Sequence, residues 1–167
     1  MPDTLLHPRV NDHCVISYDI SSDETNEYVG KCSSSGLTLS GHRTIEVRIE
    51  EPIGIAAHGN LVFLTLYAAK KVMQIDITTD QAKEFMETEH YLLQLHVDLA
   101  RSLLYFGFSD GVGVMDMDNE MEATILAGSQ EAGKQVGSFN ETRFGGVGAM
   151  LACDGSFFLV NDNTNER

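Results

Sequence analysis

The chain has 167 residues, of which 43% are hydrophobic and 22% charged, and its 15 glycines stand against only 3 prolines. This length is sufficient for one hydrophobic core, and the composition excludes a collagen, a mucin stalk and a wholly disordered chain. Lysine and arginine number 11 against 25 aspartates and glutamates, which leaves a formal net charge of −14. That charge repels phosphate backbones and anionic lipid, so neither nucleic acid nor a membrane is an expected partner.

The amino-terminal segment, Met1 to Pro8, lacks the basic start and the sustained apolar run of a secretion signal. The chain is therefore expected to be cytoplasmic, or extracellular if it is a fragment of a longer secreted protein. The longest uncharged stretch, Pro52 to Ala69, is interrupted by the turn signal His58-Gly59-Asn60. It predicts two strands and not a membrane helix.

Three cysteines, Cys14, Cys32 and Cys153, are too few and too scattered for a disulfide framework or a CxxC metal knuckle. Their odd number leaves at least one thiol free or paired between chains. Ordinary buried or half-buried thiols are the expected state of all three.

Strands dominate the chain, because Val, Ile, Leu, Phe and Tyr cluster in short runs that are bounded by Gly, Asn, Asp and Ser. The clearest predicted strands are Cys14 to Ile20, Ile53 to Ala57, Leu61 to Tyr67, Lys71 to Ile77, Tyr91 to Val97, Leu103 to Phe108, Val112 to Met117, Val147 to Ala152 and Phe157 to Asn161. Only the segment from Gln81 to Glu89 could hold a helical turn. The sequence therefore predicts an all-β protein.

Two sequence elements recur along the chain. A strand that reaches an aspartate and then turns ends at Asp19, at Asp76 and at Asp116. Two strands joined by a tight turn form the other element, at Gly54 to Phe63, Leu95 to Phe106 and Gly148 to Leu159. Joined, the elements describe a unit of four antiparallel strands, which cannot bury both faces alone and must stack on copies of itself around an axis.

These units resemble the blades of NHL-repeat and YWTD-type β-propellers. The middle unit is similar to the YWTD version through Val97-Asp98 and Leu103-Leu104-Tyr105-Phe106, and the last unit to the NHL version. The NHL likeness is carried by Ala123 to Ser129, which leads through Gly137-Ser138-Phe139 to Arg143-Phe144, and by Asn161 to Arg167. The family aspartate after the first strand is replaced by His58 in one unit and by Ala152 in another, and the chain has no tryptophan.

The resemblance implies an all-β fold, a β-propeller of four-stranded antiparallel blades with about three blades in this chain. The chain is then half of a six-bladed ring, completed by a second copy as a homodimer, or a fragment of a longer protein. Residues 1–167 form one partial propeller domain in this interpretation. Its approximate units are 1–30, the end of a blade, then 31–86, 87–128 and 129–167, the last being the start of a blade.

The strand after each tight turn is expected to lie in the packed layers between blades, because its alternate residues share one face. The residues assigned to these layers are Leu61, Phe63, Leu103, Tyr105, Phe157 and Leu159.

Two segments come near to known ligand-binding motifs. Gly128 to Gln135 is within one residue of a phosphate-binding P-loop, but Gln135 replaces the magnesium-binding hydroxyl and no helix is expected behind it, so a linker between blades is predicted. Asp116 to Glu120 has the alternating acids of a calcium loop and lacks its glycine and distant glutamate, which favours a solvated hairpin end. The repeated aspartates are expected to accept hydrogen bonds from the backbone of the turns that follow them.

The six histidines suggest a metal site, since some lyases of this superfamily bind zinc with histidines around the axis. The repeats place His58 and His96 at different blade positions, so they need not converge. His96 and Asp98 share one strand face and could pair, with no serine or cysteine nucleophile evident beside them. Asn140-Glu141-Thr142 is a glycosylation sequon, which only a secreted chain would use.

No catalytic, cofactor-binding or metal-binding residue is assigned from the sequence, and no cofactor is expected. The resemblance implies a non-enzymatic module that binds a protein or a glycan partner. The alternative is part of a propeller hydrolase or lyase with a metal site at the ring axis, and the metal content of the purified chain would discriminate between the two.

Overall fold

The protein was examined as a computed structural model that describes residues 4–9, 14–19, 22–29, 49, 51–118, 123–128, 133, 135–153 and 157–162. The described residues form thirteen strands, and the chain divides into two compact units, Met1–Glu87 and Thr88–Arg167. In this described part of the chain, no helix is long and apolar enough to cross a membrane.

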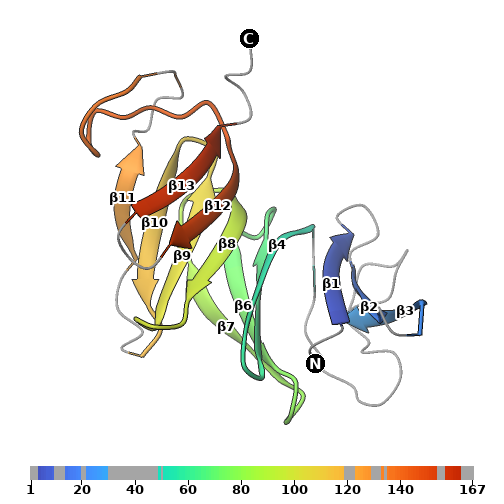
Figure 1. The fold of residues 1–167 in the computed structure, drawn as a ribbon. Coiled ribbons are helices and arrows are strands. Elements are labelled where there is room, and N and C mark those ends of the chain that lie inside the picture. The colour runs from blue at the N-terminus through green and yellow to red at the C-terminus, as the bar shows by residue number, and fades with distance from the viewer. Residues whose placement is uncertain are drawn as a thin grey trace. The chain divides into compact units, whose positions relative to one another are not determined.

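The first unit contains two antiparallel sheets (Figure 1). The three-stranded sheet has the order β1 (Thr4–Arg9), β2 (Cys14–Asp19), β3 (Glu24–Val29). The four-stranded sheet has the order β4 (Pro52–His58), β5 (Leu61–Leu66), β6 (Lys71–Asp76), β7 (Gln81–Glu87). Strand β1 lies beside β4. Each strand follows its predecessor along the chain, so short turns make all the connections within a sheet.

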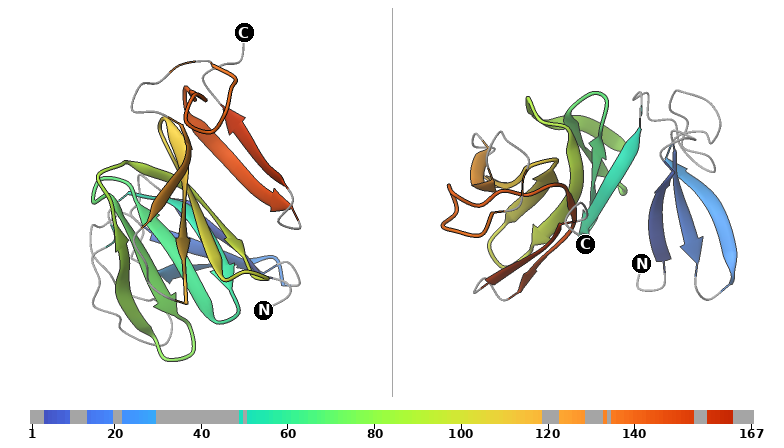
Figure 2. Two further views of the ribbon diagram at one scale, coloured as in Figure 1. Left: turned by 90° about the vertical axis from the view of Figure 1, so that its left-hand side faces the viewer. Right: turned by 90° about the horizontal axis from the view of Figure 1, so that it is seen from above.

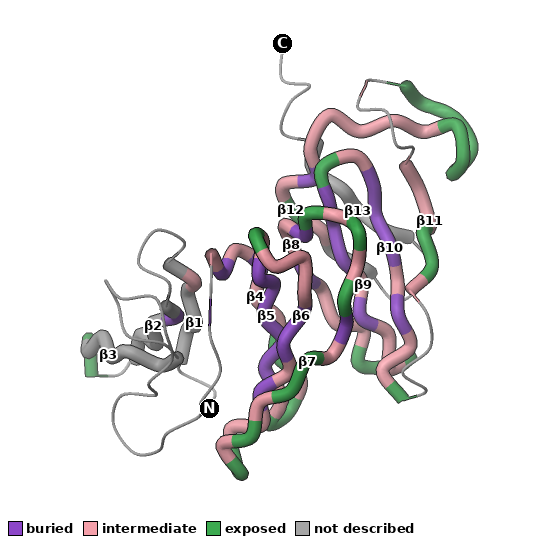
Figure 3. Tube along the Cα trace, turned by 180° about the vertical axis from the view of Figure 1, so that it is seen from behind, coloured by how far each residue is buried: buried purple, intermediate pink, exposed green. Residues whose placement is uncertain are grey.

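The core of the first unit is built on β5 and β6, whose buried residues are purple in Figure 3. Its buried residues are Val15, Ile49, Val62, Leu64, Leu66, Met73 and Ile75. Leu64 and Met73 are directly opposite each other in the β5–β6 register. This layer joins the two sheets, because Val15 belongs to β2 and the other strand residues belong to β5 and β6.

The buried polar side chain of Thr65 has its hydrogen-bonding groups satisfied inside the sheet. The Thr65 hydroxyl accepts a hydrogen bond from the Gly54 backbone N–H at 2.6 Å and faces the Gly54 carbonyl at 3.4 Å. Since an unsatisfied buried hydroxyl costs about 1–3 kcal/mol, this contact makes the threonine tolerable in the core.

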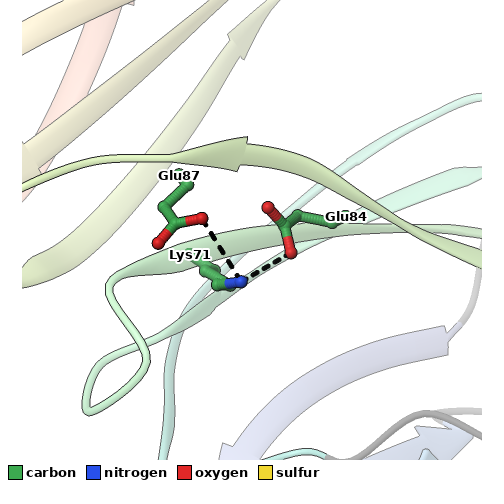
Figure 4. A network of polar contacts seen from close by, with 3 residues as sticks. All are labelled: Lys71, Glu84 and Glu87. Carbon is green, nitrogen blue, oxygen red and sulfur yellow. Dashed lines mark hydrogen bonds and ion pairs between the residues drawn. The ribbon is translucent and has the colours of Figure 1, made fainter.

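The exposed strand β7 is held to β6 by charge as well as by its backbone. Lys71 Nζ lies 2.7 Å from Glu84 Oε2 and 3.4 Å from Glu87 Oε2 (Figure 4). The hydrogen bond to Glu84 raises the pKa of Lys71. Such surface pairs add little stability individually, so the network serves mainly to align a polar edge strand.

The second unit has a four-stranded antiparallel sheet and a two-stranded one. The strands of the larger sheet are β8 (Leu92–Asp98), β9 (Leu103–Phe108), β10 (Gly111–Asp116) and β11 (Thr124–Gly128). The smaller sheet is the hairpin of β12 (Val147–Cys153) and β13 (Phe157–Asp162), and β12 packs against β8 and β9 (Figure 2). The buried hydrophobic side chains described in this unit are Leu92, Leu95, Leu104, Phe106, Phe108, Val112, Met115 and Val147.

The structure confirms the predicted all-β fold with units of four antiparallel strands. The possible helical turn from Gln81 to Glu89 is wrong, because that segment contains the strand β7. Four strands were not among the predicted ones: β1, β3, β7 and β11. These strands are polar or short, so they lack the apolar run that marks a strand in sequence. Most residues of β7 and β11 are exposed or half-buried.

For the strand after each tight turn, the prediction of which residues are buried is only partly correct. Phe63 is buried, but Leu61, Leu103 and Tyr105 are only half-buried. In β9 the buried hydrophobic side chains are those of the opposite parity, Leu104, Phe106 and Phe108. Both faces of these strands are apolar in sequence, so alternation could not identify the more deeply buried one. The side chains of Phe157 and Leu159 lie outside the described part of the structure.

Candidate functional site

Residues 135–143, between β11 and β12 in the second unit, form a hydrogen-bonded hairpin, which we call the hairpin loop. Gln135 and Arg143 form a backbone bridge, with the Arg143 N–H donating to the Gln135 carbonyl at 3.0 Å. The loop is tied to β11 because the Gly128 N–H donates to the Phe139 carbonyl at 3.2 Å. It therefore has a defined conformation although it contains no regular strand.

A reciprocal set of hydrogen bonds closes the tip of the hairpin loop. The Glu141 carboxylate accepts hydrogen bonds from the Ser138 hydroxyl at 2.7 Å and from the Ser138 N–H at 3.2 Å. The Glu141 N–H in turn donates to the Ser138 carbonyl at 2.9 Å. The Thr142 hydroxyl donates to the carbonyls of Gly137 and Ser138. The hydrogen bonds from Ser138 lower the pKa of Glu141.

Acid should loosen the hairpin loop through Glu141. Because the pKa of this carboxyl is lower in the folded chain, its stabilising effect is present above its ordinary value of 4.5 and is lost as the pH falls through the folded value. The protection factor of the Ser138 amide, which compares its exchange rate with the intrinsic rate at the same pH, should therefore fall as the pH drops below 4.5. The Glu141→Gln variant should show no such pH step in protection. An equal step in both chains would contradict the assignment to Glu141.

The hairpin loop exposes two large apolar side chains to solvent. Val136 is 98% exposed and Phe139 is 72% exposed. They are the most exposed large hydrophobic residues in the part of the chain that the structure describes. The resemblance placed Phe139 in the segment that leads into the last unit, but neither Phe139 nor Val136 was predicted to be a binding residue. Their signal is a pair of apolar residues within a Gly-, Ser- and Asn-rich turn instead of within a strand.

The aspartates that end the repeated strands are structural, as predicted. Asp76 Oδ1 accepts hydrogen bonds from the Thr78 N–H at 2.8 Å and the Thr78 hydroxyl at 2.6 Å, and Asp116 Oδ1 accepts from the Asp118 N–H at 2.9 Å. The bonds from Thr78 lower the pKa of Asp76. These aspartates shape the turns, as side-chain oxygens commonly do where a strand ends. The side chain of Asp19 is outside the described part of the structure.

Asp98 has its own partners in the turn that follows β8. Its carboxylate accepts hydrogen bonds from the Arg101 guanidinium at 2.8 Å and from the Ala100 N–H at 3.0 Å. The bond from Arg101 lowers the pKa of Asp98. Asp98 therefore closes a turn with Arg101, and the centroid of the His96 ring lies 6.4 Å from that of the Tyr105 ring. The pairing of His96 with Asp98 was only a possibility in the sequence, and these contacts do not include it.

The histidines that suggested a metal site belong to different units of the chain. His58 belongs to the first unit, and its Nδ1 is buried without a hydrogen-bond partner; His96 belongs to the second unit. His90 stacks on Phe108 with ring centroids 4.2 Å apart. Among the described residues, no group of three or more His, Cys, Asp or Glu side chains could hold a metal ion.

The two motif-like segments are used for folding where the structure describes them. The Gly133 N–H of the P-loop-like segment donates to the Phe144 carbonyl at 3.0 Å, and the Gly128 N–H is also bonded within the loop. These amides are therefore engaged and do not cradle a phosphate. In the calcium-like segment, Asn119 and Glu120 lie outside the described residues. Asn140 of the sequon is exposed in the hairpin loop.

Cys14 begins β2 and Cys153 ends β12, while Cys32 lies outside the described residues. The two described cysteines belong to different units.

Comparison with known proteins identifies the fold. No protein-family model matches the chain. No curated protein matches it either. Among solved structures, the crystal structure of the nidogen/laminin complex matches with a TM-score of 0.59 and 14% identity, covering 77% of this chain and 45% of that one. An auxiliary nutrient binding protein from Bacteroides thetaiotaomicron matches with a TM-score of 0.57 and 12% identity, covering 96% of this chain and 50% of that one.

The N-terminal domain of Nup159 is a further match, with a TM-score of 0.50 and 13% identity, covering 76% of this chain and 31% of that one. The chain thus spans half or less of the length of these structures. At these identities the likeness concerns the fold alone. With the two four-stranded antiparallel sheets, it shows that the chain is an all-β protein built from propeller-type blades.

Proposed function

We propose that the chain is part of an NHL/YWTD-like β-propeller without enzymatic activity that binds a protein or glycan partner. The observation that carries this proposal is the hairpin loop, which presents Val136 and Phe139 on a hydrogen-bonded frame. Propeller folds host many functions, so the argument depends on this surface and not on the fold.

The hairpin loop has the properties of a binding element. Because the backbone of the hairpin loop is already held by hydrogen bonds, little backbone conformational entropy is lost when a partner covers its apolar side chains. Aromatic anchors supply much of the binding energy of an interface. The net charge of −14 favours a partner with basic groups around its contact. An apolar pair of this kind favours a protein with an apolar pocket, with a glycan as the alternative outcome of the test.

The test uses peptides selected from a random displayed library on the immobilised chain. Peptides that bind the native chain should lose at least about tenfold in affinity on the double variant Val136→Ser/Phe139→Ser, because one lost apolar anchor costs more than about 1.4 kcal/mol. The folded state should be unaffected, since both side chains are exposed.

The matched control is Leu99→Ser/Ile125→Ser, which removes two apolar side chains that are 58% and 45% exposed elsewhere in the second unit. This variant should bind the same peptides as the native chain. Equal binding by all three chains would contradict the role of the hairpin loop, and binding confined to a glycan array would assign the partner to that class. Stoichiometric zinc or calcium in the purified chain would favour the alternative, a hydrolase or lyase.

We also propose that two copies pair as a homodimer to complete a six-bladed ring. The lengths support this arrangement, because 96% of this chain covers 50% of the nutrient binding protein, so two copies equal about one such chain. Light scattering of the full chain should then give a mass near twice 18.4 kDa. A monomer at micromolar concentration would contradict the pairing.

A further inference from the structure

The strand registers assign a blade position to every strand of the three-stranded sheet. In both four-stranded sheets the second and third strands pair through consecutive residues without a shift, and β1 pairs with β2 in the same way, from Thr4↔Asp19 to Arg9↔Cys14. In both complete sheets, the register in which the third strand pairs with the fourth shifts after the second residue of the third strand. The pairs of residues that flank this shift are Val72/Met73, Val112/Gly113 and, in β2, Val15/Ile16. Strands β1, β2 and β3 are therefore second, third and fourth strands.

The turn between β2 and β3 supports this assignment. Asp23 stands immediately before β3 with a φ of 58°, and Asp80 stands immediately before β7 with a φ of 54°. Non-glycine residues seldom adopt a positive φ, so its recurrence at one position marks the same kind of turn.

The β12–β13 hairpin consists of a first and a second strand. Near the start of each first strand, the register with the second strand shifts, and the flanking residues are Pro52/Ile55, Leu92/Gln94 and Val147/Ala149. Each hairpin then closes with the last residue of its first strand opposite the first residue of its second strand. The described chain thus contains a second strand twice outside the complete sheets, once as β1 and once as β13.

Strands β1 and β13 differ in how well their residues suit the second position of a blade. The first four residues of a second strand are apolar in β5 (Leu-Val-Phe-Leu), in β9 (Leu-Leu-Tyr-Phe) and in β13 (Phe-Phe-Leu-Val). In β1 they are Thr-Leu-Leu-His. His7 takes the register position of Leu64 and Phe106, which are fully buried, whereas β13 has Val160 there. At the last position both strands have a charged residue, Arg9 in β1 and Asp162 in β13. An imidazole is less suited than an aliphatic side chain to a position that is buried in the complete sheets, so β1 is the weaker second strand.

Pro8 also distinguishes β1. It lacks a backbone N–H and takes the register position of Thr65 and Gly107, inside strands that pair on both sides in the complete sheets. Proline within a sheet is largely confined to edge strands and bulges, so β1 is less suited than β13 to the second position of a complete blade, where a strand pairs on both sides. Together with His7, Pro8 makes β1 the poorer second strand for the blade that contains β2 and β3.

We propose that the β12–β13 hairpin of a second copy displaces β1, so that β13 pairs with β2 and a four-stranded blade of the order β12-β13-β2-β3 forms from two chains. This inference rests on the pairing of copies proposed above and not on the ligand of the hairpin loop. Strands β1 and β13 each have six residues, so the backbone ladder is conserved while apolar residues replace His7 and the first residue, Thr4. In the single chain, β1 covers the edge of β2 and competes with the second copy.

Cys14 allows the exchange to be trapped. In the single chain, Arg9 is the partner of Cys14, and the last residue of a second strand is always opposite the first residue of the third. After the exchange, Asp162 takes the place of Arg9 opposite Cys14. Directly opposite residues of antiparallel strands are close enough for a disulfide.

The experiment compares two full-length cysteine variants in a background of Cys32→Ser and Cys153→Ser. Mild oxidation of Asp162→Cys should give a disulfide-linked dimer with a mass near twice 18.4 kDa by light scattering, released by reductant. Oxidation of Arg9→Cys should instead lock β1 onto β2 within one chain and give a monomer that dimerises again after reduction. The double variant His7→Leu/Arg9→Leu, which makes β1 more apolar, should weaken dimerisation at least about tenfold.

Three results would overturn the inference, and they separate it from the pairing itself. A monomer in every variant and in the background refutes both the pairing and the exchange. Dimers that persist when Arg9→Cys is oxidised to an intramolecular disulfide leave the pairing intact and refute the displacement of β1. Dimers of Asp162→Cys that do not become linked on oxidation refute the proposed β13–β2 register. A linked Asp162→Cys dimer together with an oxidised Arg9→Cys monomer supports the exchange.

Discussion

Replacement of Phe63 by alanine should lower the free energy of unfolding by about 3–5 kcal/mol. Phe63 is 1% exposed, and its ring packs edge to face against Phe85 with centroids 5.1 Å apart and an interplanar angle of 71°. The substitution removes both the buried area and the ring pair, and the β-ladders on both sides of β5 limit how far the site can collapse. Urea denaturation of the native chain and of the variant measures the difference.

The matched control is Phe139→Ala, the same chemical change at a side chain that is 72% exposed. It should alter the free energy of unfolding by less than about 0.5 kcal/mol, because little area is buried there. If the two variants lost equal stability, the assignment of Phe63 to the core would be wrong.

Introduction of a side chain at Gly113 should destabilise the second unit by about 1–3 kcal/mol or more. A Cβ atom built on Gly113 would collide with the ring of Phe106, which lies over this glycine in the adjacent strand β9. Phe106 is fully buried and cannot swing into solvent. Thermal and urea unfolding of Gly113→Ala should therefore show lower midpoints than the native chain.

A second substitution, at Phe106, tests whether the ring of this residue causes the destabilisation by Gly113→Ala. Phe106→Leu alone should destabilise by removing buried area, but Gly113→Ala/Phe106→Leu should cost at least about 1 kcal/mol less than the sum of the two single changes, because the smaller side chain leaves room for the new methyl group. Strictly additive costs would indicate that Gly113 is required for its backbone and not for the space above it.

Local chemistry was sufficient to predict the strands of the interior. Leu61–Leu66 and Leu103–Phe108 are continuous apolar runs between turn residues, and the structure contains them as β5 and β9 with the same bounds or within one residue. The aspartates that follow such runs could be assigned to turns, because a carboxylate beside free backbone amides has an obvious partner, as Asp76 has in Thr78.

The sequence could not predict the edge strands or the more buried face of a strand, because both depend on contacts between residues that are distant in sequence. Strand β7 is stabilised by its ladder with β6 and by Lys71, Glu84 and Glu87, which are contacts between residues distant in sequence. Its own residues show neither an apolar run nor strict alternation. In β9 both faces are apolar, so only the packing partners decided that Leu104 and Phe106 are more buried than Leu103 and Tyr105.

The sequence by itself determined the all-β class, the repeated four-stranded unit and the turn aspartates, because each depends on residues that are neighbours along the chain. Only the tertiary structure decided that Val136 and Phe139 are exposed and that β1 and β13 hold the same strand position. Exposure depends on whether another segment folds over a side chain, and strand position depends on the hydrogen-bond register between strands. Neither is encoded in any single window of residues, since both arise from pairings across the chain.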